Sequence, residues 1–267
     1  MSQVQAILDH VPPALLVIFR IGGIMVFGPL FGSSIIPGRI KVMLAFIIGL
    51  AVYPILADSV LTPPPLKLEL FSLAPIIAME LLIGMVIGYI ASIPLTSMQT
   101  GGLMIGQQMG LGFARFFNPA VNDEADVIGQ VLFFMGLAAF LIIGGPEMML
   151  IALLNTFEYV PLGGFVPDLS LIDFIVGLLL ASFELGIRIA APVLAIVFME
   201  SVVMGFVAKT VPQINILSLG FPLRIISGFA LVAIGLTVIN DVMMDHINEM
   251  LTGMFEWVDS LAHKQGM

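Results

Sequence analysis

Long hydrophobic runs, separated by short polar stretches, dominate the pattern along the chain. With about 20 apolar residues as the length of a membrane span, six segments qualify, near residues 11–31, 40–57, 74–99, 127–155, 173–200 and 221–240. Stretches rich in Gly, Pro and Ser, such as 32–39, 58–69 and 159–173, fall between them and predict connectors. The pattern therefore predicts an all-α, polytopic helical membrane protein.

Beyond residue 240 the pattern changes from a uniformly apolar run to an amphipathic one. Apolar residues recur at three- and four-residue steps at Met243, Ile247, Met250, Met254, Val258 and Leu261. Acidic residues fall between them, at Asp245, Glu249, Glu256 and Asp259. This spacing predicts a helix with one apolar face, and its acidity favours packing on protein over binding to anionic lipid.

Composition supports the membrane assignment. Apolar residues make up 60% of the 267 residues and charged residues only 10%, whereas a soluble domain carries roughly 25% charged residues. Nine Lys and Arg residues cannot cover a water-facing surface of this size. The net charge of −9 also argues against a nucleic-acid partner, which needs a basic face.

The stretch from 101 to 126 differs from the other connectors. It opens with five glycines between 101 and 112, and no formal charge occurs between Leu81 and Ala114. Irregular backbone at membrane depth is tolerated only where it is buried in protein or lines a water-filled cavity. Two interpretations remain open from the residues alone: an ordinary Gly-rich loop, or a segment buried in a channel.

Ionisable residues inside the apolar segments are the main candidates for a special role, because each costs about 2.5–3.5 kcal/mol in a membrane. They are Arg20, Glu80, Glu184 and Arg188. Glu184 and Arg188 are four residues apart, which predicts a buried pair on one helix face; a proton relay through Glu80 or Glu184 is the alternative. Glu80 has no opposite charge within four residues, so we expect its partner on another helix or in another subunit.

The inventory of reactive residues argues against an enzyme. The three histidines, His10, His246 and His263, all lie near the ends of the chain, far from mid-chain Ser or acidic residues. Cysteine is absent, and no Gly-rich phosphate loop is followed by a Lys. We predict no catalytic residues, no cofactor and no metal site.

Three stretches together resemble the FliR family of the flagellar type III export gate. They are residues 20–32 followed by Pro37, residues 80–88 leading into 106–113 and Asn118-Pro119, and residues 191–194 followed by 211–223. The third is the most specific, with Pro212, Gln213, Asn215, Gly220 and Pro222. The resemblance runs from about residue 10 to 245, and it departs at Asn118-Pro119, where an Asp-Pro pair is expected.

The resemblance implies a fold and an assembly. The fold would be a FliP-like part, residues 1–170, followed by a FliQ-like helical hairpin and an amphipathic C-terminal helix, residues 171–267. One copy would join FliP-like, FliQ-like and FlhB-like subunits in the flagellar basal body. This complex would sit in the bacterial inner membrane, in contact with membrane lipid, and be raised toward the periplasm.

The resemblance also implies a function. The chain would be a non-enzymatic subunit that forms and seals the channel for unfolded flagellar export substrates. A plug loop at about 101–126 would close the pore with Gly106, Met109, Gly110, Leu111, Gly112, Phe113, Phe116, Phe117 and Asn118. The alternative is a small-solute or ion transporter, but such a protein typically shows internal repeats, and the two halves share no convincing repeat.

Overall fold

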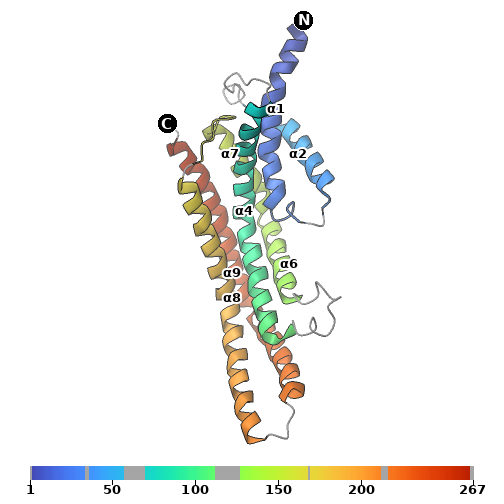
Figure 1. The fold of residues 1–267 in the computed structure, drawn as a ribbon, viewed down its shortest axis with the longest axis vertical. Helices are drawn as coiled ribbons and strands as arrows, with labels where there is room; N and C mark the ends of the chain where they lie inside the picture. The colour runs from blue at the N-terminus through green and yellow to red at the C-terminus, as the bar shows by residue number, and fades with distance from the viewer. Residues whose placement is uncertain are drawn as a thin grey trace. The chain divides into compact units, whose positions relative to one another are not determined.

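The computed structural model describes residues 2–33, 36–56, 70–111, 127–167, 169–211 and 216–264. All regular secondary structure in these ranges is helical (Figure 1), which confirms the predicted fold class. The elements are α1 (Ser2–Phe27), α2 (Gly38–Val52), the 3₁₀ helix η1 (Tyr53–Ile55), α4 (Leu70–Met109), α6 (Val127–Ile142), α7 (Gly145–Tyr159), α8 (Leu169–Thr210) and α9 (Ile216–Lys264).

Five helical segments in the described ranges are long and apolar enough to cross a membrane. They lie at His10–Phe27, Gly38–Ile55, Leu73–Met109, Leu171–Thr210 and Ser218–Ala262. The fourth predicted segment, 127–155, is broken at Gly144, whose φ of +76° is a left-handed conformation that favours glycine. The polytopic membrane class is therefore confirmed, with α6 and α7 in place of one continuous fourth span.

The most extensive difference from the sequence-based expectation concerns α4, which has 40 residues and ends at Met109. The connector expected from Gly101 therefore begins at Gly110. The first glycines of the series are needed for packing. A Cβ added at Gly101 would lie 2.8 Å from the Gly186 carbonyl oxygen, and one added at Gly102 would lie 2.5 Å from the Gly129 Cα. Helices approach this closely only where a side chain is absent.

The chain packs as two compact units that do not follow the sequence order. The first unit comprises 1–92, 140–176 and 248–267, and the second comprises 93–139 and 177–247. Helices α4, α8 and α9 each contribute residues to both units. The predicted division at residue 170 concerns resemblance to other subunits and not compactness, so it stays a prediction.

In the first unit, α1 packs against α2 and α4 through glycines. A Cβ at Gly49 of α2 would lie 2.5 Å from the Ile18 side chain of α1, and one at Gly88 of α4 would lie 2.9 Å from the Gly28 backbone nitrogen. Large apolar side chains of α1 and α4 fill the space around these contacts: Leu16, Val17, Ile21, Ile24, Ile83 and Ile87. The backbones of α1 and α4 are therefore fixed against each other.

In the second unit, parts of α4, α6, α8 and α9 form the core. The buried side chains include Met98, Ile105, Leu132, Val197, Ile239 and Met243. The Ser97 and Ser182 hydroxyls bond at 2.9 Å, which joins α4 to α8 one helical turn from the Gly101–Gly186 contact. Small residues four apart thus hold these two helices together.

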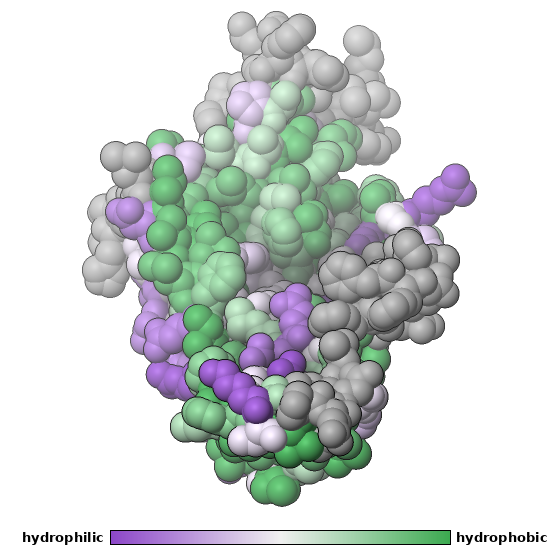
Figure 2. Space-filling view, turned by 60° about the horizontal axis from the view of Figure 1, so that its bottom comes forward, coloured by the Kyte–Doolittle hydropathy of each residue, from purple (hydrophilic) through white to green (hydrophobic). Residues whose placement is uncertain are grey.

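The amphipathic C-terminal segment is confirmed as a helix, continuous with the preceding apolar segment in α9. Met243, Ile247, Met254, Val258 and Leu261 are buried, while the four acidic residues between them are exposed. Elsewhere many large apolar side chains are exposed, among them Val42 of α2 and Ile234 of α9. Figure 2 shows broad hydrophobic areas on one face of the chain. Such a surface suits lipid or other protein chains.

Candidate functional site

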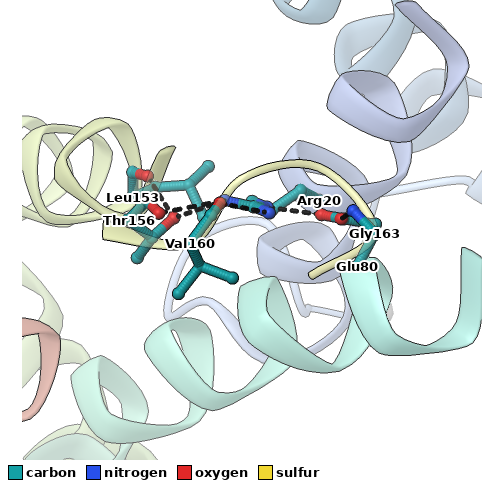
Figure 3. Close-up of polar contacts among 6 residues, drawn as sticks. All are labelled: Arg20, Glu80, Leu153, Thr156, Val160 and Gly163. Carbon is teal, nitrogen blue, oxygen red and sulfur yellow. Dashed lines mark hydrogen bonds and ion pairs between the residues drawn. The ribbon is translucent and has the colours of Figure 1, made fainter. Parts of the chain in front are cut away.

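A fully buried ion pair lies in the first unit, between α1 and α4 (Figure 3). Arg20 and Glu80 are both 0% exposed, and the Arg20 Nε donates to Glu80 Oε2 at 2.5 Å. Arg20 and Glu80 each lie one helical turn from a glycine at the contact between these helices, Gly23 in α1 and Gly84 in α4. A Cβ at Gly84 would overlap the Arg20 carbonyl oxygen. The close helix approach is what puts the two charged groups in contact.

The second oxygen of the Glu80 carboxylate is bonded as well. The backbone N–H of Gly163 donates to Glu80 Oε1 at 2.8 Å. Gly163 has a φ of +76°, in the turn that follows α7. That left-handed conformation is rare for residues with a side chain. Glycine at this position therefore allows the turn in which the N–H points toward Glu80.

The guanidinium group of Arg20 extends the network to the end of α7. Its Nη1 donates to the Thr156 carbonyl and hydroxyl oxygens, both at 3.2 Å. Nη1 and Nη2 both donate to the Val160 carbonyl at 3.1 Å. The guanidinium carbon also lies 4.2 Å from the centre of the Phe157 ring. A cation is favourable at this place, because the last carbonyls of a helix carry partial negative charge and an aromatic face attracts it.

This geometry joins three segments through one arginine: α1, α4 and the end of α7. The Glu80 partner expected on another helix or in another subunit is Arg20 of α1. Each charge is neutralised and hydrogen-bonded inside the chain, as a buried pair requires. The cluster therefore holds α1, α4 and the end of α7 together through an ion pair and hydrogen bonds.

The other predicted pair, Glu184 and Arg188 of α8, is formed but lies on the surface. Arg188 Nη2 lies 3.1 Å from Glu184 Oε1, and their side chains are 59% and 71% exposed, respectively. The expected pairing on one helix face is thus present, whereas the expected burial within the chain is not. Burial was expected because both residues lie inside an apolar segment. The sequence does not reveal which face of α8 points outward, so the exposure of this pair could not be predicted.

The structure describes only the first part of the predicted plug. Gly106 and Met109 are buried in the last turns of α4, Gly110 ends the helix with a φ of +84°, and Leu111 is half-buried. The Met109 side chain fills the space at Gly228 of α9, where an added Cβ would lie 2.5 Å from Met109 Cγ. The remaining plug residues, Gly112, Phe113, Phe116, Phe117 and Asn118, lie outside the described residues.

The motif of the third resembling stretch is also described in part. Pro212, Gln213 and Asn215 lie outside the described residues. Gly220 is buried near the start of α9, where an added Cβ would lie 3.5 Å from the Met204 Cε, and Pro222 is exposed. A side chain of alanine size at Gly220 would make only an ordinary contact with Met204 of α8.

Sequence reasoning missed the residues that complete the buried cluster: Thr156, Phe157, Val160 and Gly163. All four act through backbone groups or an aromatic face, and Thr156 also through its hydroxyl. Backbone groups and aromatic faces leave no distinctive sequence pattern. The available signal was the presence of one cation and one acid in the middle of two different spans. In the described residues, no group of three or more His, Cys, Asp or Glu side chains could hold a metal ion.

Residues 11–250 match the family described as "Bacterial export proteins, family 1". The chain belongs to this family. Among its relatives is the flagellar biosynthetic protein FliR of Bacillus subtilis, 30% identical over 238 residues, which cover 88% of this chain and 90% of the relative. FliR of Caulobacter vibrioides is 28% identical over 89% of this chain and 94% of its own length. The "Yop proteins translocation protein T" of Yersinia pestis is 25% identical over 66% of this chain and 67% of its own length.

Family membership identifies the chain as a component of a type III export apparatus, in agreement with the resemblance found in the sequence. The apolar helices place it in a membrane. In this family member the polar contacts of the Arg20–Glu80 cluster hold helices together.

Proposed function

We propose that this chain is a non-enzymatic subunit of the flagellar type III export gate, where it helps to form and seal the channel for unfolded export substrates. The observation that carries the proposal is the similarity to FliR of Bacillus subtilis along 88% of the chain. Relatives named FliR are 27–30% identical, against 25% for Yop proteins translocation protein T. The flagellar system is therefore favoured over a virulence secretion system.

The proposed gate contains FliP-like, FliQ-like and FlhB-like subunits around one copy of this chain, in the inner membrane within the basal body. The exposed apolar side chains support contacts with other chains. Four of these side chains are each 68–82% exposed: Val42, Ile142, Phe206 and Ile234. Other subunits as well as lipid can cover them. Because the Arg20–Glu80 pair is satisfied internally, these contacts rest on apolar packing and not on that pair.

Sealing is assigned to the segment from Gly106 to Asn118. The helices on either side of it support this assignment, because α4 and α6 approach backbone to backbone at Gly102 and Gly129. Met109 is fully buried at the root of the segment. A chain segment with fixed ends can close a pore without adding much to assembly, and an apolar constriction blocks ions by dewetting.

The test is a deletion of residues 110–118 in cells that make the complete export complex. Deleting residues 58–66, which removes the same number of residues from another connector, is the matched control. Assembly is measured by co-purification of the complex, and sealing is measured by leakage of small ions or solutes across the inner membrane. The 110–118 deletion should assemble and leak, whereas the control should assemble and stay tight.

Two results would reject the sealing role. A 110–118 deletion that assembles and stays as tight as the parent shows that the segment does not seal the channel. A deletion that fails to assemble while the 58–66 control assembles shows that the segment packs between subunits. Failure of the parent chain to co-purify with any export subunit would reject the export-gate assignment itself.

A further inference from the structure

An apolar groove of about 190 Å³ lies between α8 and α9 in the second unit. Its α8 side is lined by Arg188, Ile189, Pro192, Val193 and Ile196. Its α9 side includes Leu231, Gly235 and Val238. Arg188 is its charged residue, at one end of the α8 side, and the lining from there to Ile196 is hydrocarbon.

The groove follows from two residues that leave space between the helices. Gly235 has no side chain, and a Cβ added there would meet only the Ile239 Cδ1, at 3.9 Å. Pro192 on the facing helix has no backbone N–H, so the carbonyl of Arg188 lacks its usual intrahelical donor. The result is an apolar groove that begins beside the charged residue Arg188.

The charges at this end of the groove carry both signs. Arg188 is paired with Glu184 at 3.1 Å, and this bond uses one of the five N–H groups of the guanidinium. Both side chains are mostly exposed. On the facing helix, Asp241 is exposed next to Val242, which also lines the groove. A ligand headgroup here would meet the Arg188 cation beside the Glu184 carboxylate.

The spacing of charges along α8 and α9 is compatible with a membrane surface at this end of the groove. Helix α8 has 42 residues, about 63 Å at 1.5 Å per residue, twice the ~30 Å bilayer core. Between Arg188 and Lys209 the only charged residue is Glu200, and from 216 to 240 on α9 the only one is Arg224. A bilayer core that covers these two segments places Arg188, Glu184 and Asp241 at the lipid headgroups.

We propose that this groove binds one acyl chain of a phospholipid whose headgroup carries a phosphate and a primary ammonium, such as phosphatidylethanolamine. The phosphate accepts hydrogen bonds from Arg188, and the ammonium lies beside Glu184. The eight-residue rise from Arg188 to Ile196 is about 12 Å, enough for much of an acyl chain. A purely anionic headgroup fits less well, because Glu184 would repel it. This inference is independent of the proposed export function.

The experiment measures lipid retention by the full chain in detergent, using native mass spectrometry. The probes are phosphatidylethanolamine and phosphatidylglycerol with identical acyl chains, and inorganic phosphate as a competitor. Gly235→Leu fills the groove without changing charge. Gly205→Leu is its control, since a Cβ at Gly205 on the same hairpin meets nothing within 4 Å. Glu184→Gln removes the proposed ammonium partner.

The parent and Gly205→Leu should retain phosphatidylethanolamine over phosphatidylglycerol by on the order of tenfold, which is 1.4 kcal/mol. Gly235→Leu should lower retention of phosphatidylethanolamine by a similar factor. Glu184→Gln should bring the two lipids to equal retention, a result that also tests the headgroup assignment if Gly235→Leu does not fold.

Three outcomes would overturn the proposal. They are equal retention of the two lipids by the parent, unchanged retention in Gly235→Leu, and displacement of the lipid by inorganic phosphate. A fourth concerns the assembled complex. A photocrosslinker at Val238, which is 65% exposed beside the groove, should label phospholipid, and labelling of a protein subunit alone would show that a helix fills the groove instead.

Discussion

Replacing Glu80 with Gln should destabilise the first unit severely, although the two side chains have nearly the same shape. The Gln oxygen can still accept the N–H of Gly163, but the amide nitrogen then faces the Arg20 Nε, so that a donor meets a donor. More importantly, Arg20 stays charged and 0% exposed without its counterion. Removing one partner of a buried ion pair costs about 3–5 kcal/mol.

The expected change in melting temperature follows from that free energy. For a chain of this size, 1 kcal/mol corresponds to about 2–4 °C, so Glu80→Gln should lower the melting temperature by roughly 6–20 °C. The double variant Arg20→Met, Glu80→Gln removes both charges and should recover much of this loss. Recovery should be incomplete, because the Val160 carbonyl loses the donors that Arg20 provides, at about 1–3 kcal/mol.

The assay can use the single tryptophan of the chain. Trp257 is buried and stacked on Phe174 within the first unit, with ring centres 6.0 Å apart, so its fluorescence reports melting of the unit that holds the ion pair. Glu184→Gln is the matched control, since an exposed pair four residues apart contributes only about 0.3–0.5 kcal/mol. Equal melting temperatures for Glu80→Gln and this control would refute the assigned role of the buried pair.

Three further predictions concern packing and backbone conformation, and thermal unfolding followed by the far-UV circular dichroism of the whole chain checks them. Gly84→Ala should cost about 1–3 kcal/mol, because its Cβ would overlap the Arg20 carbonyl; Gly177→Ala, which meets nothing within 4 Å, should be neutral or stabilising. Gly110→Ala should cost about 1–3 kcal/mol, because φ is +84° there, whereas Gly253→Ala, in open space, should not. Met109→Ala should cost about 2–5 kcal/mol through the cavity it leaves. The account of the glycines would be contradicted if Gly84→Ala and Gly110→Ala lost no more free energy of unfolding than their controls. The account of the methionine would be contradicted if Met109→Ala lost none.

The helical membrane architecture could be predicted because it depends on the length and polarity of segments, which the sequence displays directly. Element boundaries were harder where glycine had two possible meanings. Gly101, Gly102 and Gly106 suggested a loop, but they lie inside α4, where two of them allow Gly186 and Gly129 to approach. A glycine that frees the backbone and one that admits a neighbouring helix look the same until the neighbour is known.

The candidate site could be predicted only to the level of its charged residues. Arg20 and Glu80 stood out because charges are costly in apolar spans, but several acids and cations were available, and sequence alone could not pair them. Thr156 and Val160 could not be found, since their backbone carbonyls do the binding. Pairing between distant helices depends on tertiary packing, and the glycine contacts that determine it were themselves ambiguous.

The two acid–base pairs have the same chemistry and opposite surroundings, and this difference separates their roles. Arg20 and Glu80 are desolvated and bonded on every side, so the pair fixes helices and needs nothing outside the chain. Glu184 and Arg188 are exposed, and so is the neighbouring apolar side chain of Phe183. The exposed surface of this helix is too apolar to face water. A charge at the bilayer centre costs about 2.5–3.5 kcal/mol, and moving the pair to the headgroup region removes that cost. We therefore propose that Glu184 and Arg188 position α8 and α9 along the membrane normal, and neutralising both should let these helices shift, which accessibility of a cysteine introduced at Gly205 would detect.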